Sequence, residues 1–189
     1  MRTGLKNLFT LLLLTLGLSI SAMAGNGADN YKLGGAWVAK VVDSPLPGQW
    51  SYVVVADPSG KNASGHGSVE IGFSTEAAFG YPYFEPEDTT SPLLVQVVKT
   101  GPDTASFYSI WYGLKELGPT SPVSHELVFI GISTGELKFV GPDKVHATHD
   151  FAFYYPSQDA DGDGFPDEGE TTPFVFQIKT VDTRLPLPH

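Results

Sequence analysis

Cysteine is absent from this chain of 189 residues. A chain without cysteine has no disulfide framework, so its stability must come from a hydrophobic core and from any ion that it binds. The absence also excludes a cysteine nucleophile and a lipidated N-terminal cysteine. The length suits one domain with a sizeable core.

Basic residues are scarce, with 11 Lys and Arg against 21 Asp and Glu and a formal net charge of −10. A strongly acidic protein repels phosphate backbones and anionic headgroups, which argues against nucleic acid and anionic lipid as partners. Two catalytic signatures are missing as well. The glycines do not open a helix as a phosphate-binding loop would, and the sequence GHGS at 65–68 lacks the strand–turn–helix context of a nucleophile elbow.

The N-terminus has the pattern of a secretory signal peptide. Arg2 and Lys6 precede an apolar run at 8–20, and Ala22-Met23-Ala24 forms a small-x-small cleavage site. The run is short for a spanning helix and no second one follows, so no membrane insertion is expected after cleavage. Residues 1–24 are therefore predicted to be removed, leaving residues 25–189 as one secreted or periplasmic domain. Loss of two basic residues leaves 9 against 21 acidic ones, a net charge of −12.

Amphipathic helical spacing is missing after the signal, and short β-type runs take its place. Turn residues separate many of these runs, at 57–62, 101–103, 133–135 and 141–144. Such a series predicts an all-β fold, an antiparallel meander of eight or nine strands closed as a barrel, with a β-sandwich as the alternative. The runs are 36–42, 50–56, 66–73, 93–100, 105–114, 125–132, 136–140, 144–155 and 173–181.

The stretch DADGDGFPDEGE at 159–170 carries six carboxylates in twelve positions. Read as a twelve-residue calcium loop, it has Gly164 at the sharp-turn position and acidic residues at the ligand positions. Ca²⁺ prefers six to eight oxygen ligands, which alternating Asp residues, one carbonyl and a late bidentate Glu can supply. The alternative is a solvated acidic loop. The predicted ligands are Asp159, Asp161, Asp163, the carbonyl of Phe165, Asp167 and Glu170.

Over these twelve residues the loop resembles those of EF-hands, dockerins and thrombospondin type 3 repeats. It differs from a paired EF-hand at the eighth position, where Pro166 has no N–H to give to a partner loop. Its flanks at 151–155 and 173–179 are β-type and not helical. We therefore expect a single connection between strands that is held by calcium. Its role would be stability, and it would not open a pair of helices as a calcium sensor does.

A second resemblance is to the lipocalin-like barrels. Gly35-Ala36-Trp37 resembles their G-x-W signature, and Thr148-His149-Asp150-Phe151 and Arg184 lie roughly where that superfamily has T-D-[YF] and a closing Arg. The resemblance implies an eight-stranded cup with an apolar interior and Trp37 at its closed end. The alternative is that Trp37 is a core aromatic residue of another β-fold.

Strand alternation identifies candidate interior residues. In 144–155 it places His149 on the same face as Val145 and Phe151, and in 125–132 it places His125 with Leu127 and Phe129. Both histidines are therefore predicted to point inward. A lone histidine on such a face is more often a hydrogen-bonded core residue than a catalyst.

Aromatic residues supply the other ligand candidates. Trp111 and Tyr112 are adjacent, so one of them should face the interior. The segment 74–92 is long, lacks periodicity and carries Tyr83 and Phe84, as ligand-binding loops often do; its rings alternatively cover one end of the barrel. The predicted ligand-binding residues are His149, His125, Trp111, Tyr83 and Phe84.

Together these features predict an exported, calcium-stabilised β-barrel that binds a small apolar or aromatic molecule. One alternative is a lipocalin-like barrel enzyme of the cyclase or isomerase type, with His149 as general acid or base. The other is an extracellular adhesion or matrix protein.

Overall fold

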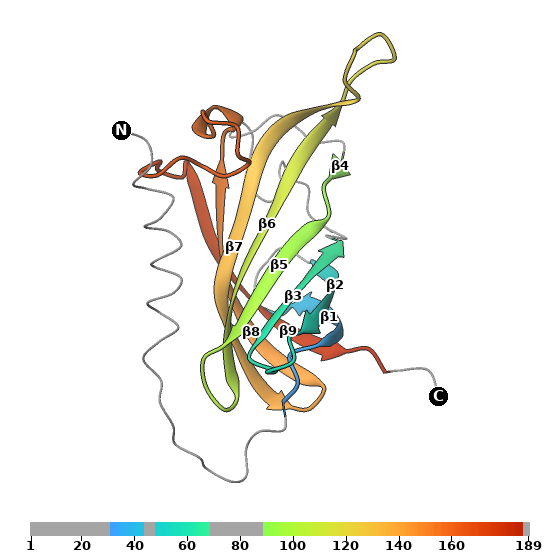
Figure 1. The fold of residues 1–189 in the computed structure, drawn as a ribbon, viewed down its shortest axis with the longest axis vertical. Helices are drawn as coiled ribbons and strands as arrows, with labels where there is room; N and C mark the ends of the chain where they lie inside the picture. The colour runs from blue at the N-terminus through green and yellow to red at the C-terminus, as the bar shows by residue number, and fades with distance from the viewer. Residues whose placement is uncertain (1–30, 44–47, 69–88, 187–189) are drawn as a thin grey trace.

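The computed structural model describes residues 31–43, 48–68 and 89–186. The predicted signal segment, Tyr83 and Phe84 lie outside these residues. Among the described residues no helix is long and apolar enough to cross a membrane. The elements, drawn in Figure 1, are β1 (Gly35–Val41), β2 (Gln49–Ala56), β3 (Asn62–Ser68), β4 (Thr89–Thr90), β5 (Leu93–Lys99), β6 (Thr104–Glu116), β7 (His125–Gly141), β8 (Lys144–Tyr154), the 3-10 turn η1 (Pro156–Gln158) and β9 (Phe174–Arg184).

The long strands form a closed antiparallel barrel. Each pairs with the next along the chain, from β1 through β2, β3, β5, β6, β7 and β8 to β9. Closure comes from β9, which returns to pair with β1 from Trp37↔Arg184 to Val41↔Thr180. The short β4 adds to β6 through Thr89↔Leu114. The prediction of an antiparallel meander closed as a barrel is confirmed, and the sandwich alternative is wrong.

Strand β7 differs from the prediction, which had two runs separated by a turn at 133–135. The structure continues without interruption from His125 to Gly141. The pairing explains the difference, because Ser133 lies opposite Ser109 on β6 and opposite Phe151 on β8. Hydrogen bonding along both edges outweighs the turn preference of Ser-Thr-Gly. As a result Ser133 is a buried wall residue.

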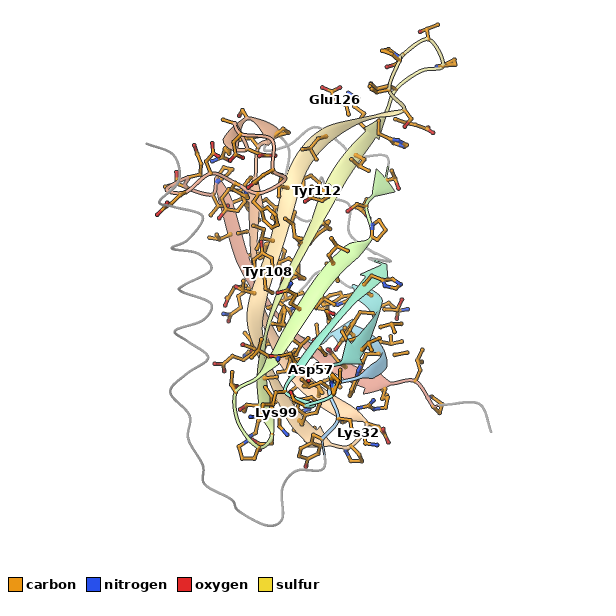
Figure 2. The ribbon with its side chains drawn as sticks, in the orientation of Figure 1. Lys32, Asp57, Lys99, Tyr108, Tyr112 and Glu126 are labelled. Atoms are coloured by element: carbon orange, nitrogen blue, oxygen red, sulfur yellow. The ribbon has the colours of Figure 1, made fainter. Side chains whose placement is uncertain are left out.

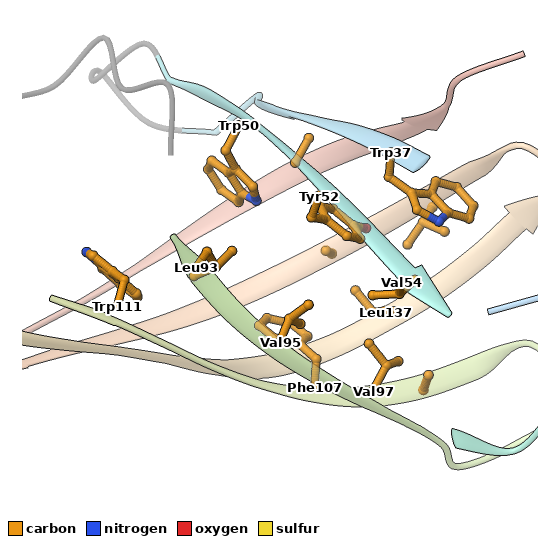
Figure 3. Packing of buried hydrophobic residues seen from close by; sticks show 14 of the residues in the cluster. Trp37, Trp50, Tyr52, Val54, Leu93, Val95, Val97, Phe107, Trp111 and Leu137 are labelled. Atoms are coloured by element: carbon orange, nitrogen blue, oxygen red, sulfur yellow. The ribbon is translucent and has the colours of Figure 1, made fainter. Parts of the chain in front are cut away.

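Alternation along the strands separates the core from the surface. On β5, Leu93, Val95 and Val97 are buried, whereas the intervening Leu94 and Val98 are 53% and 47% exposed. The same period of two holds on β8, where Val145, Ala147, Phe151 and Phe153 face inward. Figure 3 shows these inner faces contributing to one continuous core, with Trp111 toward one end and Trp37 toward the other.

The end of the barrel around Trp37 is packed with aromatic side chains. The Arg184 guanidinium carbon lies 4.2 Å from the centroid of the Trp37 ring, a cation–π contact. Arg184 also donates to the carbonyls of Lys32 and Gly34. Tyr31 stacks on Phe139 with 5.4 Å between centroids. Trp37 is thus a buried residue at a packed end of the barrel, and membership of the lipocalin-like superfamily stays a prediction.

Glycine makes room for large rings on the inner wall. A Cβ added to Gly131 would lie 2.4 Å from Cε2 of Trp111, and one added to Gly113 would lie 2.1 Å from Cε1 of Phe129. Each ring therefore lies flat against the strand beside it and not across the lumen. The cross-strand pairs are Phe107 with Gly135, Trp111 with Gly131 and Phe129 with Gly113.

We expect Gly131→Ala to destabilise the protein by about 1–3 kcal/mol, because the new methyl group overpacks the Trp111 ring. The matched control is Gly141→Ala at the C-terminal end of β7, where an added Cβ meets nothing within 4 Å. Urea unfolding of both variants measures the difference. Equal midpoints for the two variants would contradict the assigned packing.

Candidate functional site

His149 lies inside the barrel, as alternation predicted. Its side chain is 6% exposed. Three aromatic rings surround the imidazole: Phe107 at 4.7 Å between centroids, Trp50 at 4.9 Å and Phe151 at 5.8 Å. The ring is therefore enclosed by side chains from β2, β6 and its own strand β8.

Hydrogen bonds extend from this histidine in both directions. Nε2 lies 3.1 Å from Thr180 Oγ1, and Nδ1 lies 3.4 Å from Ser133 Oγ. The Thr180 hydroxyl donates to Asp182 Oδ1 at 2.6 Å, and the Tyr52 hydroxyl donates to Asp182 Oδ2 at 2.6 Å. We call these five residues, all buried, the polar chain: Ser133, His149, Thr180, Asp182 and Tyr52.

Burial sets the protonation states along the polar chain. It lowers the pKa of His149 to about 3, so the imidazole is neutral near pH 7. Burial also raises the pKa of Asp182, and hydrogen bonds from Thr180 and Tyr52 oppose that shift. The pKa of Tyr52 lies well above its usual value, first because of burial and then because of the Asp182 charge. Tyr52 therefore keeps its proton and donates it.

Four of the five members of the polar chain were not predicted from the sequence. Asp182 and Thr180 continue the inward alternation of Ile178 on β9, and this period is visible in the sequence. Tyr52 has no such signal, because its partner Asp182 is 130 positions away. Ser133 was assigned to a turn.

Trp111 lies in the interior with 4% of its surface exposed, which confirms the prediction for the 111–112 pair. Its ring makes edge contacts with Phe151 and Phe153, both at 5.6 Å between centroids. Phe151 stacks in turn on Phe176 at 4.8 Å. The interior around Trp111 is thus a cluster of aromatic rings, and Phe151 connects this cluster to His149 of the polar chain.

His125 does not face the interior, and the prediction that it does is wrong. The residue is exposed and its Nδ1 lies 2.9 Å from Ser124 Oγ. A β-bulge explains the error. Pairing shifts from Gly113↔Phe129 to Leu114↔Leu127, which leaves Val128 unpaired and reverses the alternation for Leu127 and His125. Neighbouring Glu126 lies where β7 extends beyond the rest of the barrel (Figure 2).

Of the long loop at 74–92, only its C-terminal end is described. The Ser91 N–H donates to the Tyr112 carbonyl at 2.9 Å, and the Tyr112 N–H donates to Ser91 Oγ at 3.0 Å. These bonds attach the end of the loop to β6. Tyr83 and Phe84 lie outside the described residues.

The acidic loop brings together three of its predicted calcium ligands. Carboxylate oxygens of Asp159, Asp161 and Asp163 all lie within 4.8 Å of one another. One Ca²⁺ with oxygens at about 2.3–2.6 Å spans such a separation, so these residues fit the ion. Gly162 and Gly164 have φ of +71° and +89°, which lets the chain turn tightly between the carboxylates.

The other predicted ligands are not part of this group. Asp167 Oδ2 accepts from the Ala160 N–H at 3.2 Å, and Glu170 Oε2 accepts from Gln158 Nε2 at 2.8 Å. Gln158 also closes the base of the loop, since its carbonyl accepts from the Asp167 N–H at 2.7 Å. The Phe165 side chain is 46% exposed.

Tyr112 connects the acidic loop to the barrel wall. Its hydroxyl donates to the Gly164 carbonyl at 3.0 Å. Burial raises the pKa of Tyr112, and the charges of Asp159 and Asp163 raise it further. Figure 2 places Tyr112 toward the end of the barrel that carries the loop. Trp111 and Tyr112 are adjacent on β6, so Trp111 packs in the interior while Tyr112 binds the loop.

No protein-family model matches this chain, and no curated protein is similar to it in sequence. Among solved structures, it is similar to EF1p2_mFAP2b, in a structure bound to DFHBI. The TM-score is 0.40 with 13% identity, covering 80% of this chain and 92% of that one. A similarity of this strength assigns no function to this chain.

Protonation of His149 should make stability depend on pH. Its folded pKa of about 3 lies below the usual 6.5, so this contribution to stability is present above pH 6.5 and is lost as pH falls toward 3. Between pH 7 and pH 4 we expect a loss of about 3 kcal/mol from this group. His149→Gln should flatten that part of the profile.

The matched control is His66→Gln, at an exposed histidine of β3. The free energy of unfolding of the wild type and of the two variants is measured with denaturant at several pH values. A His149→Gln profile parallel to wild type between pH 7 and pH 4 would show that His149 is not buried as a neutral base.

Proposed function

We propose that the protein is an exported, calcium-stabilised β-barrel that binds a small apolar or aromatic molecule in its interior. The observation that carries the proposal is the interior itself. Aromatic rings from β2, β6, β8 and β9 face inward around one buried imidazole and its polar chain. Sites for small molecules are typically apolar and aromatic with a few placed polar groups.

The aromatic cluster supports a flat, unsaturated ligand in particular. Trp111 and Phe107 lie beside Gly131 and Gly135 of β7, so both rings pack on the inner wall of the barrel. Offset or edge contacts between rings add about 0.5–1.5 kcal/mol each beyond the buried area. The closed sheet holds these rings in place, which reduces the ordering cost of binding.

The enzyme alternative has less support. A pKa of about 3 leaves His149 without an acidic proton near pH 7, so it cannot act there as a general acid. As a base it is weak, and both of its nitrogens already have hydroxyl partners. These contacts favour a structural imidazole that fixes polar groups beside a ligand.

Export is proposed from the N-terminal sequence alone. It is consistent with the absence of cysteine and with the acidic loop, because millimolar extracellular calcium would saturate a site with a dissociation constant of about 10⁻⁵ M. Asp159, Asp161 and Asp163 would hold the ion. Asp167, Glu170 and the Phe165 carbonyl would complete its oxygen shell.

The role proposed for the ion is stability. Three carboxylates within 4.8 Å repel one another when no cation is bound, by very roughly 1 kcal/mol per pair in water. An ion at 100 times its dissociation constant adds about 2.7 kcal/mol to the folded state.

Chelation with EDTA should therefore lower the thermal midpoint of the wild type, and excess Ca²⁺ should restore it. Asp161→Ala and Glu170→Gln should remove this response. The matched control is Glu168→Gln, which makes the same charge change as Glu170→Gln within the loop but at a position outside the predicted ligand set. Differential scanning calorimetry with and without EDTA checks each protein. If EDTA left the thermal midpoint of the wild type unchanged and metal analysis found no calcium, residues 159–170 would be an acidic loop that binds no ion.

Ligand binding is tested with N-phenyl-1-naphthylamine, a neutral aromatic probe whose fluorescence rises in apolar surroundings. We expect saturable binding at one site of the mature protein. Trp111→Leu should weaken it at least severalfold, because it removes a ring face from the interior. The control Tyr155→Leu changes an aromatic residue that is 38% exposed and should bind like wild type. Absence of saturable binding to the folded protein would contradict the proposed function.

A further inference from the structure

We propose that the interior selects aromatic molecules that donate a hydrogen bond, such as phenols and aryl amines, and rejects aromatic carboxylates. This inference rests on the proposed function, since it names the chemistry of the ligand that the barrel would take. It is carried by the direction in which the polar chain points its hydrogens and by the charge buried beside it.

The direction of the chain follows from Asp182. Its two carboxylate oxygens accept from two different hydroxyls, those of Tyr52 and Thr180. A hydroxyl has a single proton, and that of Thr180 is used on Asp182. Thr180 Oγ1 must therefore accept at its contact with His149 Nε2, which makes Nε2 the protonated nitrogen.

The neutral imidazole then has an acceptor at its other nitrogen. Nδ1 carries a lone pair and lies 3.4 Å from Ser133 Oγ, so the Ser133 hydroxyl donates to it. The neighbouring Ser109 hydroxyl donates to the Ser133 carbonyl at 3.3 Å. Both serine protons are thus directed to groups of the protein. The two hydroxyl oxygens therefore have only lone pairs left, and these can accept a hydrogen bond but cannot donate one.

The two serines lie together among ring faces. Ser109 and Ser133 are opposite each other in the β6–β7 register, and both are buried. Phe107 and Trp111 flank Ser109 at two positions on either side along β6, and their rings lie over Gly135 and Gly131 on β7. An aromatic ligand stacked on these rings would bring a ring substituent to the serine oxygens. A substituent with an O–H or N–H would satisfy them.

The same surroundings disfavour an anion. Of the charged side chains among the described residues, only that of Asp182 is classed as buried. Arg184 lies at the Trp37 end of the barrel, where its guanidinium already binds the carbonyls of Lys32 and Gly34. A carboxylate would share the interior with the Asp182 charge, and no cation is buried there among the described residues. An unpaired buried charge is costly.

The experiment compares three naphthalenes of similar size by titration calorimetry on the mature protein. 2-Naphthol donates a hydrogen bond, 2-methoxynaphthalene does not, and 2-naphthoate is an anion. We expect 2-naphthol to bind about threefold to tenfold more tightly than the methyl ether, the range for one net hydrogen bond. 2-Naphthoate should bind at least about a hundredfold more weakly than 2-naphthol.

Replacement of both serines in one variant, Ser109→Ala with Ser133→Ala, should lower the affinity for 2-naphthol to that for the methyl ether and leave the ether's affinity unchanged. The matched control is Ser106→Ala on the same strand as Ser109, at an outward-facing position opposite Val98 and Glu136. This control should keep the full preference for 2-naphthol. An unchanged preference in the folded double variant would overturn the assignment of the two serine oxygens as acceptors.

The outcomes separate the two proposals. If all three naphthalenes bind equally, or if 2-naphthoate binds best, the barrel binds aromatics and the inference about donors is wrong. If none binds to folded wild type, the proposed function fails and the inference fails with it. The ring nitrogen shifts of ¹⁵N-labelled His149 give a readout without ligand. A proton on Nε2 is expected, and one on Nδ1 would reverse the chain and overturn the inference.

Discussion

The pairing of β9 with β1 is the interaction on which the rest of this structure depends. It removes the two open edges of the sheet and so defines an inside and an outside for every strand. Its register places Asp182 opposite Ala39 and Arg184 opposite Trp37. Since Ala39 has a small side chain, the Tyr52 hydroxyl on β2 can reach across β1 to the Asp182 carboxylate. Closure thus brings together the aromatic side chains around Trp37 at one end of the barrel and the polar chain in its interior.

The polar chain is a poor source of stability, and this makes its presence informative. Burying a carboxylate costs several kcal/mol before its partners are counted, and apolar residues of similar volume often serve a core as well or better. Every member of the chain has a hydrogen-bond partner, so the network fixes proton positions and rotamers. A barrel needs no such order to fold. Fixed proton positions and rotamers are useful if the interior must distinguish one small molecule from another.

Local sequence patterns were enough for the fold class but not for the composition of the site. Period-two alternation correctly placed His149 inside and required one of Trp111 and Tyr112 to face inward, because the strand pairing is regular at these positions. It failed for His125, since the bulge at Val128 reverses the faces and leaves no mark in the alternation of the residues before it. The turn predicted at 133–135 was also wrong, because pairing on both edges of β7 outweighs the turn preference there. The contact of Tyr52 with Asp182 depends on the register across the closure, which no local pattern encodes.

The acidic loop was predictable because its chemistry is contained within twelve consecutive residues, yet its attachment to the barrel was not. Gly164 meets two separate demands. Its φ of +89° favours glycine, and a Cβ there would lie 2.9 Å from the Tyr112 hydroxyl. The bond from Tyr112 to the Gly164 carbonyl does not involve a carboxylate, so it can persist whether or not a cation neutralises the Asp cluster. Loss of the proposed ion should therefore loosen the acidic turn while its attachment to β6 holds, which would limit the effect of such an ion to a fraction of the domain's stability.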